Sequence, residues 1–215
     1  GKLRNLRIAL QVGKRKSGAL MNRLFHVPLS PFCRAVRLVM AEKKLGVELV
    51  EEKYWEARPE FMRRNPAGQV PILQIDGLTL CDSVAICEYI EEAHPTPALM
   101  PQSVADRAEV RRLVMWFNDK FYSEVTLNLL GERVNKKIMG AGYPDSKNVK
   151  VGAKQIKYHL DYMGWLLDQR RWLAGDSMTM ADFAAAAQLS SLDYIRDVDW
   201  NRNAQVKDWY AKIKS

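Results

Sequence analysis

The sequence has 215 residues and contains no apolar run that approaches the roughly 20 residues needed to span a membrane as a helix. It holds only three cysteines, Cys33, Cys81 and Cys87, an odd number that does not suit a disulfide framework and favours a reducing compartment such as the cytoplasm. No cysteine stands three residues before Cys33, so a dithiol redox motif is excluded. Cys81 and Cys87 lie in apolar surroundings, and we expect both to be core residues.

Acidic residues are missing from residues 1–20, which carry six of the 33 basic residues of the chain. Without these six, 27 basic residues face 25 acidic ones, so the formal net charge falls from +8 to +2. The remaining chain therefore predicts no basic surface for nucleic acid. The leader could be an unstructured tail, an extension upstream of a natural start at Met21, or a targeting segment, although it lacks serine enrichment and a long apolar run.

Strand and helix patterns alternate between residues 21 and 93. Strands are predicted over residues 23–27, 47–51, 70–75 and 78–81, and helices over residues 32–44, 59–63 and 83–93. Asp76 and Gly77 predict a hairpin between the last two strands. The order β-α-β-α-β-β-α predicts a thioredoxin-like α/β domain.

Three prolines fall within residues 94–101, which cannot continue a helix and are predicted to be a linker. The remainder, residues 102–215, is predicted to be all-α, with helices over 105–130, 148–173, 179–197 and 206–214. Thr179 and Asp182 form a capping-box pattern at the start of the third of these helices. The expected organisation is therefore a leader over residues 1–20, a thioredoxin-like domain over 21–93, the linker, and a helical domain.

The segment from Leu29 to Arg37 places Ser30 and Pro31 at the predicted start of a helix that follows the first strand. The unpaired N–H groups and the dipole of a helix N-terminus stabilise a nearby thiolate, so the Ser30 hydroxyl could donate a hydrogen bond to a ligand sulfur. Serine is also a favoured N-cap and proline is favoured at the next position, so Ser30 could be a purely structural cap.

Several segments together resemble the glutathione S-transferase superfamily from Arg23 to Ser215. They are residues 29–37, 65–71 and 82–86, the proline-rich linker, and residues 173–176 with the capping box that follows. The resemblance implies a thioredoxin-like domain followed by an all-helical domain, usually as a homodimer. It also implies a glutathione site made by Ser30, Cys33, Gln69, Val70, Pro71, Asp82 and Ser83.

The resemblance gives these residues separate roles, each with a structural alternative. Ser30 would be the catalytic residue, Val70 before a cis Pro71 would meet the cysteinyl part of glutathione, and Asp82 with Ser83 would hold its γ-glutamyl group. The last pair could equally be a helix cap.

Two further positions qualify the implied site. Cys33 could form a mixed disulfide with glutathione. Gln69 stands where related enzymes often carry lysine, which removes one positive charge and weakens the case for tight glutathione binding.

Within the superfamily, residues 132–137, 158–166 and 197–200 resemble the bacterial FtsZ-localised division proteins. This resemblance implies a non-enzymatic cytoplasmic protein that binds FtsZ at the division site, needs no cofactor and organises filaments. The alternative is a cytosolic transferase that conjugates glutathione to an apolar electrophile. A transferase needs an open apolar second site between the domains with Ser30 facing it, whereas a binding protein needs an exposed patch away from that cleft.

Two groups of residues are candidates for contact with a protein partner. Tyr54 and Trp55 form an aromatic pair in a charged loop and could anchor an interface, or pack locally. Arg133, Lys136 and Lys137 form a basic run that could steer an acidic partner such as FtsZ, or simply be a solvated helix end.

Overall fold

The computed structural model describes residues 22–214, so the predicted leader and Met21 lie outside the described residues. One mixed sheet contains β1 (Arg23–His26), β2 (Glu48–Glu51), β3 (Ile72–Ile75) and β4 (Leu78–Cys81), in the order β2-β1-β3-β4. Strand β1 pairs in parallel with β2 and antiparallel with β3, which in turn pairs antiparallel with β4. This arrangement confirms the predicted thioredoxin-like half.

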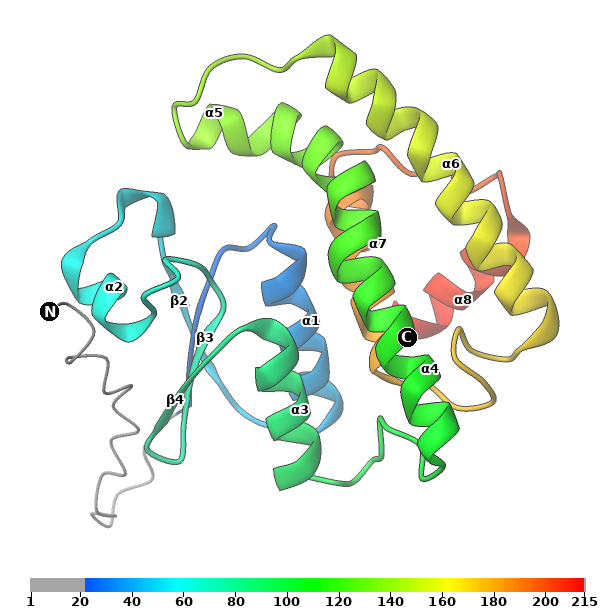
Figure 1. The fold of residues 1–215 in the computed structure, drawn as a ribbon, viewed down its shortest axis with the longest axis horizontal. Helices are drawn as coiled ribbons and strands as arrows, with labels where there is room; N and C mark the ends of the chain where they lie inside the picture. The colour runs from blue at the N-terminus through cyan, green and yellow to red at the C-terminus, as the bar shows by residue number, and fades with distance from the viewer. Residues whose placement is uncertain (1–21, 215) are drawn as a thin grey trace, which may run out of the picture.

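Helices cover both faces of this sheet (Figure 1). On one side lie α1 (Pro31–Glu42) and α3 (Ser83–Ala93), and on the other lies α2 (Pro59–Arg64), which follows the short 3-10 turn η1 (Tyr54–Glu56). Phe61 of α2 is fully buried in a small core with Phe25 and Ile72 of the sheet. The prediction that α1 reaches residue 44 is wrong by two residues, because Lys44 has a φ of +54°, which a right-handed helix cannot accommodate.

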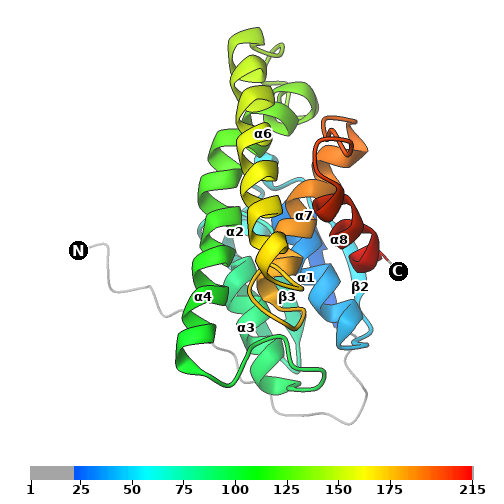
Figure 2. The same cartoon turned by 90° about the vertical axis from the view of Figure 1, so that its right-hand side faces the viewer.

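The second half is helical, as predicted. Its first helix runs without a break through α4 (Val104–Met115), the π-helical segment η2 (Trp116–Asn135) and α5 (Lys136–Ile138), eight residues beyond the predicted end. It is followed by α6 (Ser146–Gln169), α7 (Met180–Tyr194) and α8 (Ala204–Lys214), and Figure 2 shows α4, α6 and α7 lying side by side. No helix within residues 22–214 is long and apolar enough to cross a membrane.

The prediction that the helix before the capping box reaches residue 173 is wrong. Helix α6 ends at Gln169, Arg170 is extended, and Trp172 pairs with Gly175 in a short bridge. Leu173 is fully buried in this turn. Its apolar side chain fits the spacing of a helix face, but it packs into the core from a loop.

The segment between the two halves is bonded to both of them. Glu91 of α3 accepts hydrogen bonds from the backbone N–H groups of Leu99 and Met100, at 2.9 and 3.1 Å, and pairs with Lys43. The Leu99 carbonyl accepts from the N–H of Met180 at the start of α7. One large core, which includes Val36 of α1 and residues of every later long helix, continues across both halves.

Candidate ligand-binding cleft

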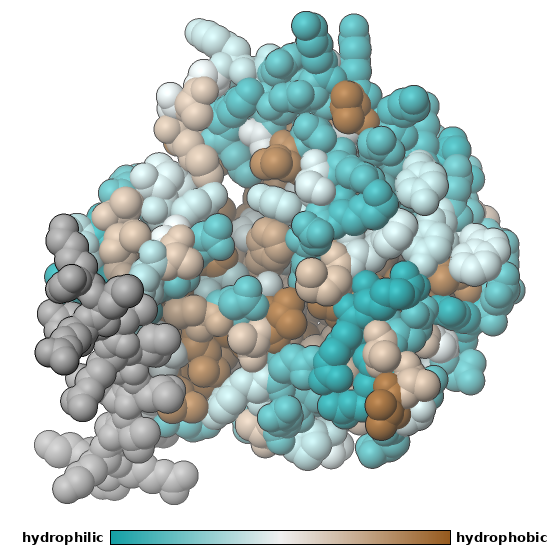
Figure 3. All heavy atoms as spheres, in the orientation of Figure 1, coloured by the Kyte–Doolittle hydropathy of each residue, from teal (hydrophilic) through white to brown (hydrophobic). Residues whose placement is uncertain are grey.

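A cleft of about 650 Å³ lies between the two halves. Figure 3 shows it as a hollow between the sheet half on the left and the helical half, with apolar side chains on its walls. The sheet half contributes the β1–α1 loop and the η1 turn, and the helical half contributes η2, α5 and the end of α7. Its apolar walls include Leu29, Phe32, Tyr122, Leu130, Ile138 and Met139. An open apolar space between the halves is therefore present, as a transferase requires.

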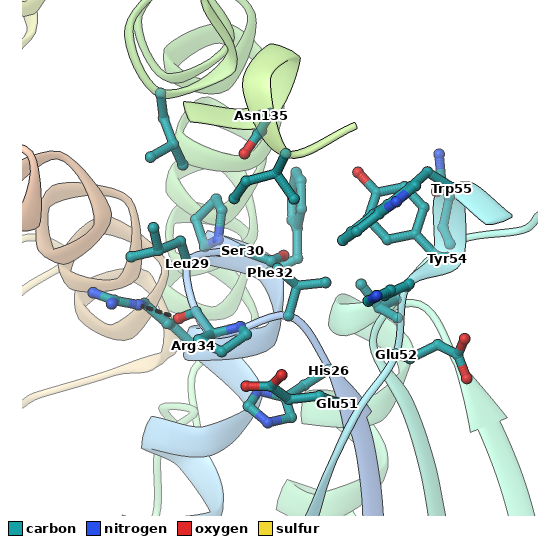
Figure 4. Close-up of a pocket in the computed structure, with 18 of the residues that line it drawn as sticks. His26, Leu29, Ser30, Phe32, Arg34, Glu51, Glu52, Tyr54, Trp55 and Asn135 are labelled. Atoms are coloured by element: carbon teal, nitrogen blue, oxygen red, sulfur yellow. Dashed lines mark hydrogen bonds between the residues drawn. The ribbon is translucent and has the colours of Figure 1, made fainter. Parts of the chain in front are cut away.

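Ser30 lies on the wall of this cleft, in the region where the two halves meet (Figure 4). Its backbone is extended, Pro31 follows as the first helical residue, and its hydroxyl oxygen accepts a hydrogen bond from the N–H of Cys33 at 3.4 Å. The predicted cap is thus confirmed. Because an accepting hydroxyl keeps its own proton for donation, the cap leaves Ser30 able to donate to a ligand sulfur.

A second cavity of about 340 Å³ adjoins the cleft and shares Phe32, Gln69, Val70 and Asn118 with it. It is lined as well by Pro71, Asp82 and Ser83, so the structure gathers most of the residues that the resemblance assigned to glutathione. The Val70–Pro71 peptide is cis, as expected. The dimensions suit a peptide-sized ligand that extends from Ser83 towards Ser30.

Asp82 caps helix α3 at the floor of the second cavity. One oxygen of its carboxylate, Oδ1, accepts from the N–H groups of Val84 and Ala85, at 2.8 and 3.1 Å. Its φ of +75° is unusual for a residue with a side chain. With Oδ1 occupied by the cap, Oδ2 is the oxygen left to face a ligand ammonium group, so capping and binding are compatible here.

The loop that carries Gln69 is braced by Asn65. The Asn65 side chain donates to the Gln69 carbonyl at 2.8 Å and accepts from the N–H of Ala67 at 3.1 Å. This brace fixes the backbone beside Val70. It supplies no charge in place of the lysine common in related enzymes.

Two of the three cysteines, Cys33 and Cys81, are placed differently from expectation, whereas Cys87 is a core residue as expected. Cys33 is fully buried in the small core, lines neither cavity, and burial raises the pKa of its thiol. The structure therefore does not bring Cys33 to a bound ligand. Cys87 is in the large core, whereas Cys81 is only half-buried and lines the second cavity, where burial and then Asp82 raise the pKa of its thiol.

Tyr54 and Trp55 stand at the opposite side of the cleft mouth from Asn135 (Figure 4). Their rings meet edge to face, with centroids 5.4 Å apart. Tyr54 packs against the small core, and burial raises the pKa of its phenol, which therefore stays protonated. Both residues are partly exposed, so local packing and contact with a ligand or partner are both open to them.

The basic run at the end of the long helix is mostly paired. Arg133 forms an ion pair with Asp197 at 3.1 Å, and Lys136 pairs with Glu132. Glu132 also accepts from the N–H of Asp145, and these contacts lower the pKa of its carboxyl to about 2. Exposed Lys137 has no ion pair among the residues that the structure describes, so it is the cation of this run most available to a partner.

Several cleft residues could not be found by reading the sequence. His26 is 4% exposed at the cleft floor, and burial, followed by the charge of Arg37, lowers the pKa of its imidazole. Phe32 and Tyr122, from different halves, bring their rings to 4.8 Å and span the cleft wall. No cluster of His, Cys, Asp and Glu side chains within the described part of the chain could hold a metal ion.

The sequence matches two profiles of one family. The profile described as the N-terminal domain of glutathione S-transferase matches residues 24–98, and the profile described as the C-terminal domain matches residues 134–215.

Individual relatives carry names of two kinds. FtsZ-localized protein A of Caulobacter vibrioides is 43% identical over 196 residues, which are 89% of this chain and 86% of that protein. The solved structure of FzlA from C. crescentus is similar with a TM-score of 0.87 and 42% identity, covering 91% of this chain and 88% of that one. A solved glutathione S-transferase from Rhodospirillum rubrum is similar with a TM-score of 0.88 and 49% identity, and it covers the same shares of the two chains.

Proposed function

Because the chain belongs to the glutathione S-transferase family, we propose that it is a transferase-like protein that binds FtsZ filaments and organises them in bacterial cell division. The observation that carries this proposal is the 43% identity to FtsZ-localized protein A over most of both chains. The proposal places the protein in the cytoplasm at the division site. A homodimer would present two copies of one binding surface and could therefore link neighbouring filaments through avidity.

Features of the surface support this proposal. Trp55 is a partly exposed aromatic residue in a charged segment at the mouth of the cleft, not away from it, and aromatic residues are favoured anchors of protein interfaces. Lys137 offers an exposed positive charge to an acidic partner. The weakened charge of the glutathione site, with Gln69 in place of lysine, agrees with a protein that needs no cofactor.

The test is co-sedimentation of the purified protein with FtsZ polymerised in GTP. We expect saturable co-sedimentation, weakened at least about tenfold by Trp55→Ala or by Lys137→Glu, because each removes an anchor or reverses a steering charge. Lys154→Glu is the matched control for charge, since Lys154 is an exposed lysine on α6 away from the cleft. Absence of the protein from the pellet at saturating FtsZ would rule the proposal out.

Glutathione transfer is a second candidate, favoured by the position of Ser30 on an open apolar cleft between the halves. In this reaction the glutathione sulfur attacks an apolar electrophile and displaces its leaving group. The Ser30 hydroxyl would hold the thiolate by a hydrogen bond, and the N-terminus of α1 would add its dipole. The electrophile would lie against Leu29, Phe32 and Tyr122.

Ser30→Ala tests this second function, with glutathione and a chlorodinitrobenzene as substrates. A transferase should lose about 10²-fold in kcat, the size of effect seen when one donor to a reacting anion is removed. Ser103→Ala is the matched control, because Ser103 caps α4 with the same 3.4 Å geometry far from the cleft. Calorimetric titration of the wild-type protein with glutathione completes the test. If no heat of binding is measured, and if the Ser30→Ala variant still binds FtsZ, Ser30 is a structural cap alone.

A further inference from the structure

Helix α6 exposes one long face on the outer side of the helical half (Figures 1 and 2). Its other face packs on η2 so closely that a Cβ at Gly152 would lie 2.8 Å from the side chain of Leu129. On the exposed face, four lysines follow one another at intervals of three, four and three residues, which places them in one line on a helix with 3.6 residues per turn. This lysine row is about 15 Å long. It consists of Lys147, Lys150, Lys154 and Lys157, all exposed.

The charge of the lysine row is not balanced by neighbouring acids. Residues 146–160 contain the four lysines and no acidic residue, so the near balance of charge over most of the chain hides a local concentration. No ion pair in the described part of the chain includes a lysine of the row. The nearest acids in sequence have other partners, because Asp145 caps the helix through the N–H of Lys147 and Asp161 pairs with Arg202 at 2.6 Å.

The lysine row is unfavourable for the helix that carries it. Its successive members are three or four residues apart, so like charges are neighbours on the helix surface and repel each other. Lys147 and Lys150 also stand near the N-terminus of α6, where the helix dipole disfavours a cation. Solubility does not require this arrangement, since a face of mixed charges serves it equally well. An anionic partner would relieve both unfavourable effects.

Exposed apolar side chains accompany the lysine row. Val151 and Tyr158 are 49% and 53% exposed, and because they are seven residues apart they lie on one side of α6. Leu127 of η2, the helix on which α6 packs, is 50% exposed. No lysine of the row lines the central cleft or the second cavity, so the partner must present an extended surface rather than enter a pocket.

The combination of lysines and apolar side chains on a convex face suits an anionic lipid bilayer. A bilayer presents phosphate groups directly above hydrocarbon, and a lysine can lay its stem on the apolar layer while its ammonium stays among the phosphates. Tyrosine is favoured at this boundary, because its ring is apolar and its hydroxyl is polar. Nucleic acid also carries phosphates, but it offers no apolar layer to Val151, and the row has no arginine to read base edges.

We propose that the outer face of α6 is a docking surface for anionic phospholipid bilayers. The lysine row lies among the headgroups, and Val151 and Tyr158 reach the boundary with the acyl chains. The contact is peripheral, since no helix within residues 22–214 is able to span a membrane. It is separate from Trp55 and Lys137, and the proposal is independent of the proposed function in FtsZ binding.

Flotation of the full chain with vesicles of phosphatidylglycerol and phosphatidylcholine tests the proposal, with pure phosphatidylcholine vesicles as the neutral comparison. We expect binding to the anionic vesicles alone. Each lysine at an anionic surface contributes about fivefold to binding, so the double variant Lys150→Gln/Lys154→Gln should bind at least about tenfold more weakly. The matched control Lys44→Gln/Lys207→Gln removes two exposed lysines outside α6 and should bind as the wild type does.

Val151→Ser tests the apolar part of the contact. It should weaken vesicle binding at least about threefold, because less apolar surface is buried in the bilayer. Val104→Ser is its matched control, since Val104 is 85% exposed at the start of α4 and should have no effect.

Three results would overturn the proposal. The first is that the wild-type protein does not float with anionic vesicles. The second is equal vesicle binding by the wild type and Lys150→Gln/Lys154→Gln, which would assign the contact to another basic part such as residues 1–20. The third is binding to duplex DNA that exceeds vesicle binding and is unchanged by Val151→Ser. FtsZ co-sedimentation without lipid is measured separately, so either proposal can fail while the other stands.

Discussion

At the scale of single residues, Asp182 shows how one buried carboxylate joins three parts of the chain. It is fully buried, and burial raises the pKa of its carboxyl while the hydrogen bonds it accepts oppose that change. Oδ1 accepts from the N–H of Leu173 at 3.0 Å and from the indole of Trp209 at 2.9 Å. Oδ2 accepts from the N–H of Thr179 at 2.8 Å, which completes the predicted capping box.

We expect Asp182→Ala to lower the free energy of unfolding by about 3–5 kcal/mol, because it leaves several buried hydrogen-bond donors without an acceptor. Urea unfolding followed by circular dichroism measures this loss. Asp176→Ala is the matched control, since Asp176 is exposed in the same turn and should change stability by less than about 0.5 kcal/mol. Equal stability of the two variants would contradict the role given to Asp182.

At the scale of elements, η2 is joined to α6 through a buried histidine. The indole N–H of Trp116 donates to Nδ1 of His159 at 3.1 Å, and Nε2 of His159 lies 3.0 Å from Glu124. An indole can only donate, so Nδ1 is the acceptor and the proton of the neutral ring is on Nε2, where it bonds Glu124. His159 is completely buried, and burial lowers the pKa of its imidazole.

This junction predicts a pH dependence of stability. Below a pH of about 6.5 the unfolded chain protonates His159, whereas the folded protein resists protonation, so stability falls as the pH falls. Thermal unfolding at pH 7.5 and pH 5.5 should show a smaller decrease in Tm for His159→Gln than for the wild type. His26 contributes equally to both proteins, so an identical decrease in the two would contradict this account.

At the scale of the whole molecule, the features that could be predicted are the order of the elements and the helix starts, which depend on short stretches of sequence. The alternation of strand and helix signals gave the order of the sheet half, and local caps at Ser30, Asp82 and Thr179 marked three helix starts correctly. Such signals depend on neighbours within a few residues, so they survive without tertiary information. Helix ends were less certain, because the apolar Leu173 suited both a helix face and a buried turn.

The central cleft could be predicted only on its sheet side. Ser30, Gln69 and Val70 belong to short motifs, whereas Tyr122 and Tyr194 reach the cleft through the packing of distant helices. Apolar periodicity also fails to separate an α-helix from the π-helical turns of η2, because both bury one face.

The bonded segment around Glu91 and Leu99 bears on how the protein would distinguish its ligands. The backbone at Leu99 is bonded both to Glu91 of α3 and to Met180 of α7, so this segment braces the two halves against each other. Together with the shared core, this brace holds the two halves in a fixed relative position. The shape of the cleft is then largely set before any ligand enters it, and the side chains and loops that line it are left to adjust.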